Sequence, residues 1–412
     1  MTNLSKTAIR ITWVLFANQC LASAGFIAAA TINSILGAKL GGSDYWTGVP
    51  SAVYLLGAAF AASAWGYIMD RIGRRNSMTL GLLLGMVGNA LVLFAIRTSS
   101  LIVFLIGMVL MGITNAIVVL GRFVAAEVNP PEGRGKAISL VVWGGTFGVI
   151  FGPLLVGPTG NFVKTLGMDE LAGAYLSTLI LFGVAAVVVF IGLRPDPRDV
   201  GGEIAERYPE STPHGEMRPV REILSQPAAL TALMAMVLGQ VVMVALMVIT
   251  SLHMNHHQHG LTDISHVIQA HTFGMYAFSI VSGYLVDQWG RRPVILSGAG
   301  LLLLACITAP LSPDVLPLGI ALFFLGLGWS FCFVGGSTLL ADQLSPAERS
   351  RTQGFNDLLV GLASAAASLS SGLIFAATNF TIISIVAGGL TLIPLLMAML
   401  MLKRKTVVVS AA

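Results

Sequence analysis

The sequence predicts an all-α membrane protein with twelve transmembrane helices. Of its 412 residues, 55% are hydrophobic and only 10% are charged. Apolar stretches of about twenty residues recur along the whole chain, and each is long enough to cross a hydrocarbon core of about 30 Å as a helix. The Lys and Arg residues gather in alternate connections between these stretches. The chain is therefore predicted to be polytopic.

Twelve apolar stretches are expected as helices. The first is too long for a signal peptide, and no small-residue cleavage pattern follows it. The expected spans cover residues 11–35, 47–69, 77–96, 100–125, 137–160, 171–193, 227–252, 264–286, 293–311, 316–341, 353–377 and 379–402.

The distribution of basic residues predicts the topology. If both termini are cytoplasmic, nineteen of the 23 Lys and Arg residues lie in cytoplasmic segments, Arg122 lies within a span, and only Lys39, Arg97 and Lys164 lie outside. Cytoplasmic connections carry this excess in membrane proteins. The net charge of +4 therefore reflects the orientation of the chain in the membrane. The expected partner is the lipid bilayer, and no nucleic acid is expected to bind.

An internal repeat divides the chain. Gly66-x-x-x-Asp70-Arg71-x-Gly73-Arg74-Arg75 follows the second span and recurs 217 residues later as Gly283-x-x-x-Asp287-Gln288-x-Gly290-Arg291-Arg292. A weaker echo relates residues 127–136 to 342–351. Residues 194–226 turn charged and contain Pro and Gly. We expect a six-helix half at 1–193, a cytoplasmic linker at 194–226 and a second six-helix half at 227–412, which is transporter architecture.

The repeated motif resembles the signature of the major facilitator superfamily, and the resemblance covers the whole chain. It implies two six-helix halves that alternate access to a central site. It also implies a cytoplasmic gate at the motif residues, although setting the topology is a simpler role for them. The second copy carries Gln288 in place of Arg71, which predicts a weaker second latch. The gating residues are Gly66, Asp70, Arg71, Gly73, Arg74, Asp287 and Arg291.

Two further features bear on coupling. Arg122 is an ionisable residue within an apolar span, and such residues are costly and usually functional. Its expected partner is Glu127, and the pair is a candidate for proton coupling; the alternative is that Arg122 pairs with a helix end or with a polar residue of the cavity. Gly144, Gly148 and Gly152 in the fifth span resemble the antiporter motif of drug/proton exchangers, although glycines at this spacing commonly serve close helix packing.

Methionine and histidine residues form a candidate metal pathway. Six of the seven histidines lie between His253 and His271. Met243 and Met247 are one helical turn apart near the outer end of the seventh span, and His271 and Met275 are one turn apart in the eighth. The two pairs reach similar depths, about 8–16 Å at 1.5 Å per residue. Thioethers with an imidazole suit Cu(I) better than harder ions. Methionine is also a common core filler.

The pairing of M-x-x-x-M with H-x-x-x-M resembles the CcoA-like copper importers, a branch of the same superfamily. Met243, Met247, His271 and Met275 match its four residues in type and spacing. The resemblance implies copper import across the bacterial cytoplasmic (inner) membrane for assembly of a cbb3-type cytochrome oxidase. It also implies delivery to an intracellular copper-accepting protein. Copper is then a transported substrate, and no cofactor is expected.

The connection between the seventh and eighth spans offers a second candidate metal site. Its residues either capture metal weakly at the outer mouth or form a solvated polar turn. They are His253, Met254, His256, His257 and His259.

The alternative function is a proton-coupled transporter of a small organic molecule, either a drug/solute antiporter or a riboflavin-type importer. The chain contains no G-x-x-x-x-G-K-[ST] phosphate loop. Its three cysteines lie in expected spans without a C-x-x-C pattern. The sequence therefore favours a secondary transporter over an enzyme or an ATP-driven pump.

Overall fold

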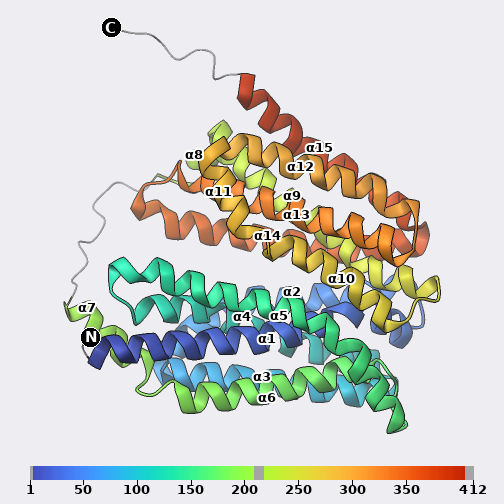
Figure 1. Cartoon of the computed structure of the whole chain (residues 1–412), viewed down its shortest axis with the longest axis horizontal. Helices are drawn as coiled ribbons and strands as arrows, with labels where there is room; N and C mark the ends of the chain where they lie inside the picture. The colour runs from blue at the N-terminus through green and yellow to red at the C-terminus, as the bar shows by residue number, and fades with distance from the viewer. Residues whose placement is uncertain (1–2, 208–217, 404–412) are drawn as a thin grey trace. The chain divides into compact units, whose positions relative to one another are not determined.

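The computed structural model describes residues 3–207 and 218–403. Within these residues the chain forms helices and no strand. Figure 1 shows them in order. Their bounds are α1 (Asn3–Gly41), η1 (Asp44–Trp46), α2 (Val49–Ile72), α3 (Arg74–Thr98), α4 (Leu101–Glu127), α5 (Pro131–Thr165), α6 (Ala172–Gly192), α7 (Pro197–Arg207), α8 (Val220–Ser225), α9 (Pro227–His256), α10 (Leu261–Tyr276), α11 (Ser279–Trp289), α12 (Arg291–Thr308), η2 (Ala309–Leu311), α13 (Val315–Ala341), α14 (Pro346–Ala377) and α15 (Phe380–Lys403).

The helices group into two compact units. Of the described residues, the first unit contains 3–207 and His259–Gln269, and the second contains 218–258 and 270–403. In the first unit α1 packs on α5 and α6, while α4 packs on α2 and α3. In the second, α13 packs on α9 and α12, and α15 packs on α9 and α12. The repeat in the sequence is thus matched by two helical units.

Within the described residues the number of spans comes close to the twelve expected. Ten helices are long and apolar enough to cross a membrane, and an eleventh span is bent by 49° between Ala62 and Ala64. The expected span at 264–286 is instead two helices, α10 and α11. The hydroxyls of Ser279 and Ser282 donate to the carbonyls of Tyr276 and Phe278 at 2.8 and 2.9 Å. Such back-bonding competes with the helical ladder and bends helices.

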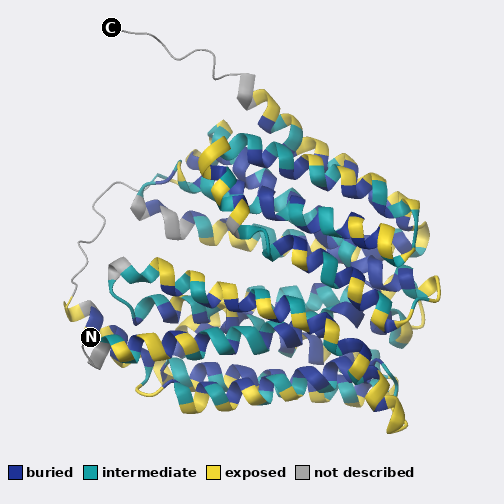
Figure 2. Cartoon of the chain, viewed as in Figure 1, coloured by how far each residue is buried: buried dark blue, intermediate teal, exposed yellow. Residues whose placement is uncertain are grey.

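Both units carry apolar side chains on their outer surfaces. Residues buried within a unit lie along the faces turned toward its other helices (Figure 2). Large apolar side chains such as Phe60, Ile102 and Leu316 are more than 70% exposed. A soluble protein rarely shows so much apolar surface, whereas lipid accepts it. This pattern is that of a multi-pass membrane protein.

Close helix approach in the first unit explains the glycines of the fifth span. A Cβ at Gly148 would lie 2.5 Å from the backbone nitrogen of Ala24, and one at Gly152 would lie 2.6 Å from the carbonyl oxygen of Ala24. The α1–α5 contact is therefore backbone against backbone, as small residues permit in membranes. The packing role of these glycines is visible in the structure, and the antiport role stays a prediction.

Candidate functional site

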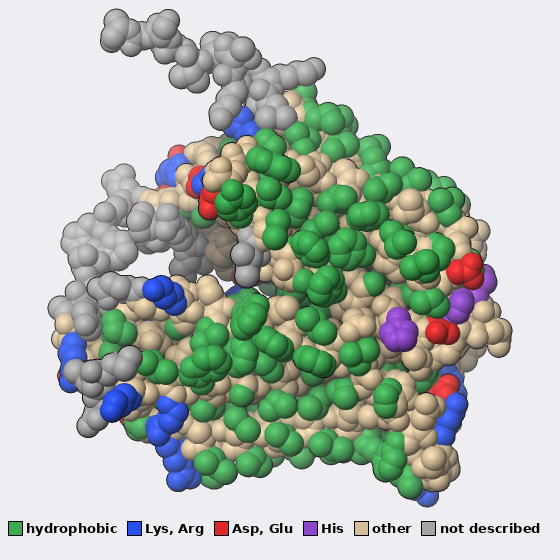
Figure 3. Space-filling view, in the orientation of Figure 1, with side chains coloured by type: hydrophobic (Ala, Val, Ile, Leu, Met, Phe, Trp, Pro, Cys, Tyr) green, Lys and Arg blue, Asp and Glu red, His purple; other side chains and the backbone are tan. Residues whose placement is uncertain are grey.

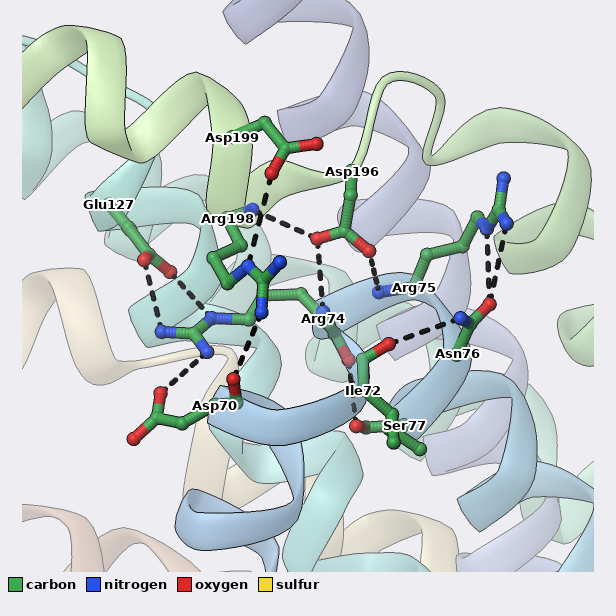
Figure 4. Close-up of polar contacts among 11 residues, drawn as sticks. Asp70, Ile72, Arg74, Arg75, Asn76, Ser77, Glu127, Asp196, Arg198 and Asp199 are labelled. Atoms are coloured by element: carbon green, nitrogen blue, oxygen red, sulfur yellow. Dashed lines mark hydrogen bonds and ion pairs between the residues drawn. The ribbon is translucent and has the colours of Figure 1, made fainter.

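The first copy of the repeated motif forms an ion-pair network centred on Arg74. The Arg74 guanidinium donates to Asp70 at 2.7 Å and, through two nitrogens, to both oxygens of Glu127 at 3.0 and 3.1 Å (Figure 4). The Arg74 side chain is only 15% exposed. Two parallel bonds to one carboxylate are a strong, directional arrangement. Arg74 therefore fastens the end of α2 and the start of α3 to the end of α4.

A turn separates α2 from α3, and its conformation requires glycine. Gly73 has φ +84° and ψ 165°, and Gly290 in the second copy has φ +88° and ψ 165°. L-residues rarely adopt this region. The repeated glycine in the motif is thus a backbone requirement that both units share.

Two linker residues join the network, and neither was singled out from the sequence. The Asp196 carboxylate accepts from the backbone N–H groups of Arg74 and Arg75 at 3.0 and 3.2 Å. These are free donors at the first turn of α3, where a negative charge is favourable. Arg198 donates to the carbonyl oxygen of Asp70 at 2.9 Å. Little in the sequence indicated these contacts, because the partners are more than 120 residues away along the chain. The one local feature was the position of Asp196 between two prolines.

The second copy of the motif forms a smaller network. Arg291 donates to the Asp342 carboxylate at 2.7 and 3.4 Å, which repeats the Arg74–Glu127 pair. Asp287, which corresponds to Asp70, is exposed and forms no ion pair in the part of the chain that the structure describes. The two motif copies therefore differ in two ways: Asp70 pairs with Arg74 whereas Asp287 does not pair with Arg291, and Gln288 stands in place of Arg71.

The second unit holds a further ion pair that ties the end of the linker to α14. Arg218 donates to both oxygens of Glu348 at 2.8 Å and to the carbonyl oxygen of Gln343 at 2.8 Å. Glu348 also accepts from the backbone N–H of Ser345 at 2.9 Å, which caps α14. The Arg218 guanidinium holds the pKa of Glu348 well below its usual value. The charged carboxylate is thus the form that the structure requires.

The Arg218–Glu348 pair should make the stability of the protein depend on pH in acid. Because the folded state lowers the pKa of Glu348, its contribution to stability is present above the ordinary value of 4.5 and is lost as pH falls further below it. We expect the contribution of this pair to the melting temperature of the wild type to be independent of pH between about pH 6 and 8. Glu348→Gln should lower the melting temperature in that window and converge with the wild type in acid. A constant difference down to about pH 3 would contradict the ionic role.

Arg122 does not pair with Glu127. Glu127 accepts from Arg74, whereas the Arg122 guanidinium lies 4.8 Å from the centre of the Phe123 ring, with its Nε buried and without a hydrogen-bond partner. Residues five apart point to different sides of a helix, since only positions three or four apart are neighbours. The expected pairing is therefore wrong, and a coupling role for Arg122 stays a prediction.

All four residues of the expected copper pathway lie in the second unit. Met243 on α9 and Met275 on α10 are each 7% exposed, Met247 is half-buried and His271 is fully buried. The structure ties His271 to α13: its Nδ1 lies 3.0 Å from the carbonyl oxygen of Leu322. A Cβ at Gly326 of α13 would lie 2.1 Å from the carbonyl oxygen of His271. Residue 271 is therefore held firmly in place.

The bond to Leu322 selects the tautomer of the neutral His271 ring. A carbonyl oxygen only accepts, so Nδ1 carries a hydrogen, and in the neutral ring Nε2 carries the lone pair. Nε2 is buried and has no hydrogen-bond partner among the described residues. A buried acceptor without a partner is costly. This nitrogen is therefore available to a ligand, whether a metal ion or a solute N–H or O–H group.

The histidines at the end of α9 and in its connection to α10 form no metal cluster among the described residues. The His253 ring stacks on Phe380 at 4.5 Å, and Nδ1 of His257 lies 2.9 Å from the carbonyl oxygen of His253. His256 lies 5.8 Å from Phe375. His259 Nδ1 lies 3.8 Å from Asp263. Residues 3–207 and 218–403 contain no group of three or more His, Cys, Asp or Glu side chains suited to a metal.

Met254 does not fit the expected outer-mouth site. It is fully buried, because α9 continues to His256 and turns this side chain into the unit. The thioether of Met254 is therefore not available for metal capture at the surface.

An aromatic cluster with one amide lies on the half-buried surface of the second unit, and the sequence analysis missed it. Trp329 Nε1 donates to Gln240 Oε1 at 2.6 Å. The Trp329 ring stacks on Phe333 at 5.1 Å and lies 6.1 Å from the ring of Tyr276. The four residues come from α9, α10 and α13. Only Gln240, an amide within an apolar span, was a signal in the sequence.

Comparison with known proteins identifies the family. The family model described as Major Facilitator Superfamily matches residues 15–262 and 240–411. The uncharacterized MFS-type transporter YdeG of Bacillus subtilis (strain 168) is 33% identical over 93% of this chain and 90% of its own. The riboflavin transporter RfnT of Brucella anthropi is 29% identical over 93% and 94%.

A solved structure agrees on the fold. The nucleoside transporter NupG superposes with a TM-score of 0.72 at 14% identity, over 98% of this chain and 100% of NupG. The superfamily resemblance inferred from the repeated motif is thus confirmed, and the finer resemblance to CcoA-like importers stays a prediction. The chain belongs to the Major Facilitator Superfamily.

Proposed function

We propose that this secondary transporter carries a small organic solute with a planar aromatic ring system, of the riboflavin type. Members of the superfamily are transporters and not enzymes. The observation that carries the proposal is the cluster of Gln240, Tyr276, Trp329 and Phe333 within the second unit. The likeness to the riboflavin transporter RfnT along nearly the whole chain supports the same class of cargo.

The chemistry of the cluster suits such a solute. An amide within a membrane span is costly unless it lines a polar cavity or a binding site. The Gln240 amide, held in place by the Trp329 N–H that it accepts, supplies directional contacts, while the faces of Tyr276 and Trp329 offer surfaces on which a flat ring can stack. Binding sites that combine aromatic faces with a few placed polar groups are typical of small-molecule recognition. His271 Nε2 adds a hydrogen-bond acceptor in the same unit.

The proposal includes the orientation of the chain and the membrane in which it lies. The one-sided distribution of Lys and Arg supports cytoplasmic termini and insertion in a bacterial inner membrane. The predicted cycle is alternating access of a site between the two halves. The network around Arg74 would then serve as the inner latch.

Copper is a second candidate cargo, favoured by one specific observation. In its neutral form His271 presents an unprotonated Nε2, which is buried without a hydrogen-bond partner among the described residues. Metal-ligating histidines commonly hold their other nitrogen in this way, by donating to a backbone carbonyl. Met243 and Met275 are buried in the same unit, and thioethers with imidazole suit Cu(I). The sequence match to CcoA-like importers supports the same reading, with an intracellular copper acceptor as its expected partner.

Uptake measurements with two cargoes separate the proposals. Cells that lack their own uptake systems would express the wild type, His271→Ala or Met243→Leu at matched levels, with Met399→Leu as a control at an exposed methionine. An organic-solute carrier should accumulate riboflavin, and Met243→Leu should change this less than twofold. A copper carrier should accumulate radioactive copper, and both His271→Ala and Met243→Leu should lower this at least tenfold. Wild-type accumulation of neither cargo would refute both readings.

A further inference from the structure

Two arginines of the first unit flank the Phe190 ring, and a third, Arg10, joins them through the backbone of Arg194. The guanidinium carbons of Arg75 and Arg194 lie 5.3 and 5.4 Å from the centre of the Phe190 ring. The Arg10 guanidinium donates to the carbonyl oxygen of Arg194. The residues come from α1, α3, α6 and the segment directly after α6. Segments far apart in the sequence thus bring three positive charges to one place.

These charges are not neutralised by carboxylates. In residues 3–207 and 218–403, none of the three arginine side chains forms an ion pair. The Arg75 side chain bonds only to the amide oxygen of Asn76, at 3.3 and 3.4 Å. Figure 4 shows this side chain directed away from Glu127 and Asp70. The nearby Asp196 carboxylate is engaged with backbone N–H groups. The cluster therefore keeps an excess of positive charge.

Phe190 places the cluster at a membrane boundary. It lies two residues before the end of the apolar span Ala172–Gly192. Toward the middle of that span, Val187 and Ile180 are 57% and 55% exposed. Gly183 lies between them, and a Cβ there would meet only the end of Met86 from α3, at 3.4 Å. An apolar strip on α6 therefore leads from the guanidinium groups toward the membrane interior.

We propose that Arg10, Arg75, Arg194 and Phe190 form a binding site for an anionic phospholipid. The phosphate of the headgroup would accept from the guanidinium groups, and one acyl chain would lie along Val187, Gly183 and Ile180. Arginine is suited to phosphate because it offers several donors in a planar fork. Basic pockets between membrane helices at a cytoplasmic surface typically bind such headgroups. Space-filling Figure 3 shows Lys and Arg beside apolar side chains at this end of the first unit.

Native mass spectrometry of the purified full-length chain tests the site. Cardiolipin, phosphatidylglycerol or phosphatidylethanolamine would be titrated, and the apparent Kd of the first bound lipid measured. We expect the anionic lipids to bind at least tenfold more tightly than phosphatidylethanolamine. Arg75→Gln or Arg194→Gln alone should raise the apparent Kd for the anionic lipids about fivefold, and the double variant should raise it about 25-fold. Phe190→Leu should weaken it about twofold to fivefold, because the ring that orders both guanidinium groups is lost.

Arg207→Gln is the matched control, since it removes an exposed positive charge from the end of α7. If it weakens binding as much as Arg75→Gln, the attraction is diffuse and the site is refuted. Equal binding of all three lipids would also refute it. If inorganic phosphate displaces cardiolipin from the wild type, the cluster is a simple anion site and the lipid proposal fails. Phe190→Leu keeps the charges, so a loss in that variant cannot be ascribed to net charge.

Discussion

Trp329→Ala is expected to lower riboflavin accumulation about thirtyfold. The change removes a stacking surface, worth about 0.5–1.5 kcal/mol for an aromatic pair. It also leaves the Gln240 amide oxygen without its donor at 2.6 Å, at a cost of about 1 kcal/mol. Together these effects amount to about 2 kcal/mol, or a factor of about thirty in affinity. The measurement is initial uptake of labelled riboflavin at concentrations below saturation, in cells with matched expression.

Two further tryptophan variants make the result specific. Trp329→Phe keeps an aromatic face and loses the N–H, so it should retain more uptake than Trp329→Ala. Trp289→Ala removes a tryptophan that is 57% exposed at the end of α11 and should change uptake less than twofold. Unchanged riboflavin uptake in Trp329→Ala would exclude the cluster from the substrate site. If copper uptake fell instead with His271→Ala while Trp329→Ala had no effect on it, the copper reading would stand.

Arg74→Gln should reduce transport of either cargo at least tenfold while the protein still reaches the membrane. Arg74 is largely buried and donates to two carboxylates, so its loss leaves Glu127 and Asp70 without a counter-charge. Arg74→Lys keeps the charge but cannot reproduce the fork toward Glu127 and should be intermediate. Initial uptake rates, normalised to protein in isolated membranes, provide the measurement.

The corresponding variant in the second unit is the matched comparison. The Arg291 side chain is 33% exposed, and within residues 3–207 and 218–403 its one ion pair is with Asp342, whose side chain is 41% exposed. Exposed ion pairs contribute about 0–1 kcal/mol, so Arg291→Gln should change transport less than about fivefold. Equal losses in the two variants would show that the motif copies serve the cycle equally. Asp287→Asn should have little effect, because Asp287 has no ion pair among the described residues.

The sequence contained enough to predict the membrane fold, because lipid imposes a simple rule. A span must satisfy its backbone internally and present apolar side chains, and both requirements are local. The repeated motif likewise indicated two halves. The positive φ that Gly73 and Gly290 share was visible only in the structure, although glycine readily permits it. The break between α10 and α11 was missed, since serine back-bonding is invisible to a hydropathy pattern.

The partners of individual side chains were decided by the tertiary structure. Glu127 follows Arg122 closely in sequence, yet it pairs with Arg74, 53 residues away, since i and i+5 do not share a helical face. Met254 is buried although it stands among histidines in an expected loop. His271 was found from sequence, but its free Nε2 depends on the Leu322 carbonyl of another helix. The sequence by itself determined which segments enter the membrane and which residue types are available there. Only the packing of the helices decided which charges are paired, which nitrogen is left for a ligand and which aromatic rings meet, because these contacts join residues that are distant in the chain.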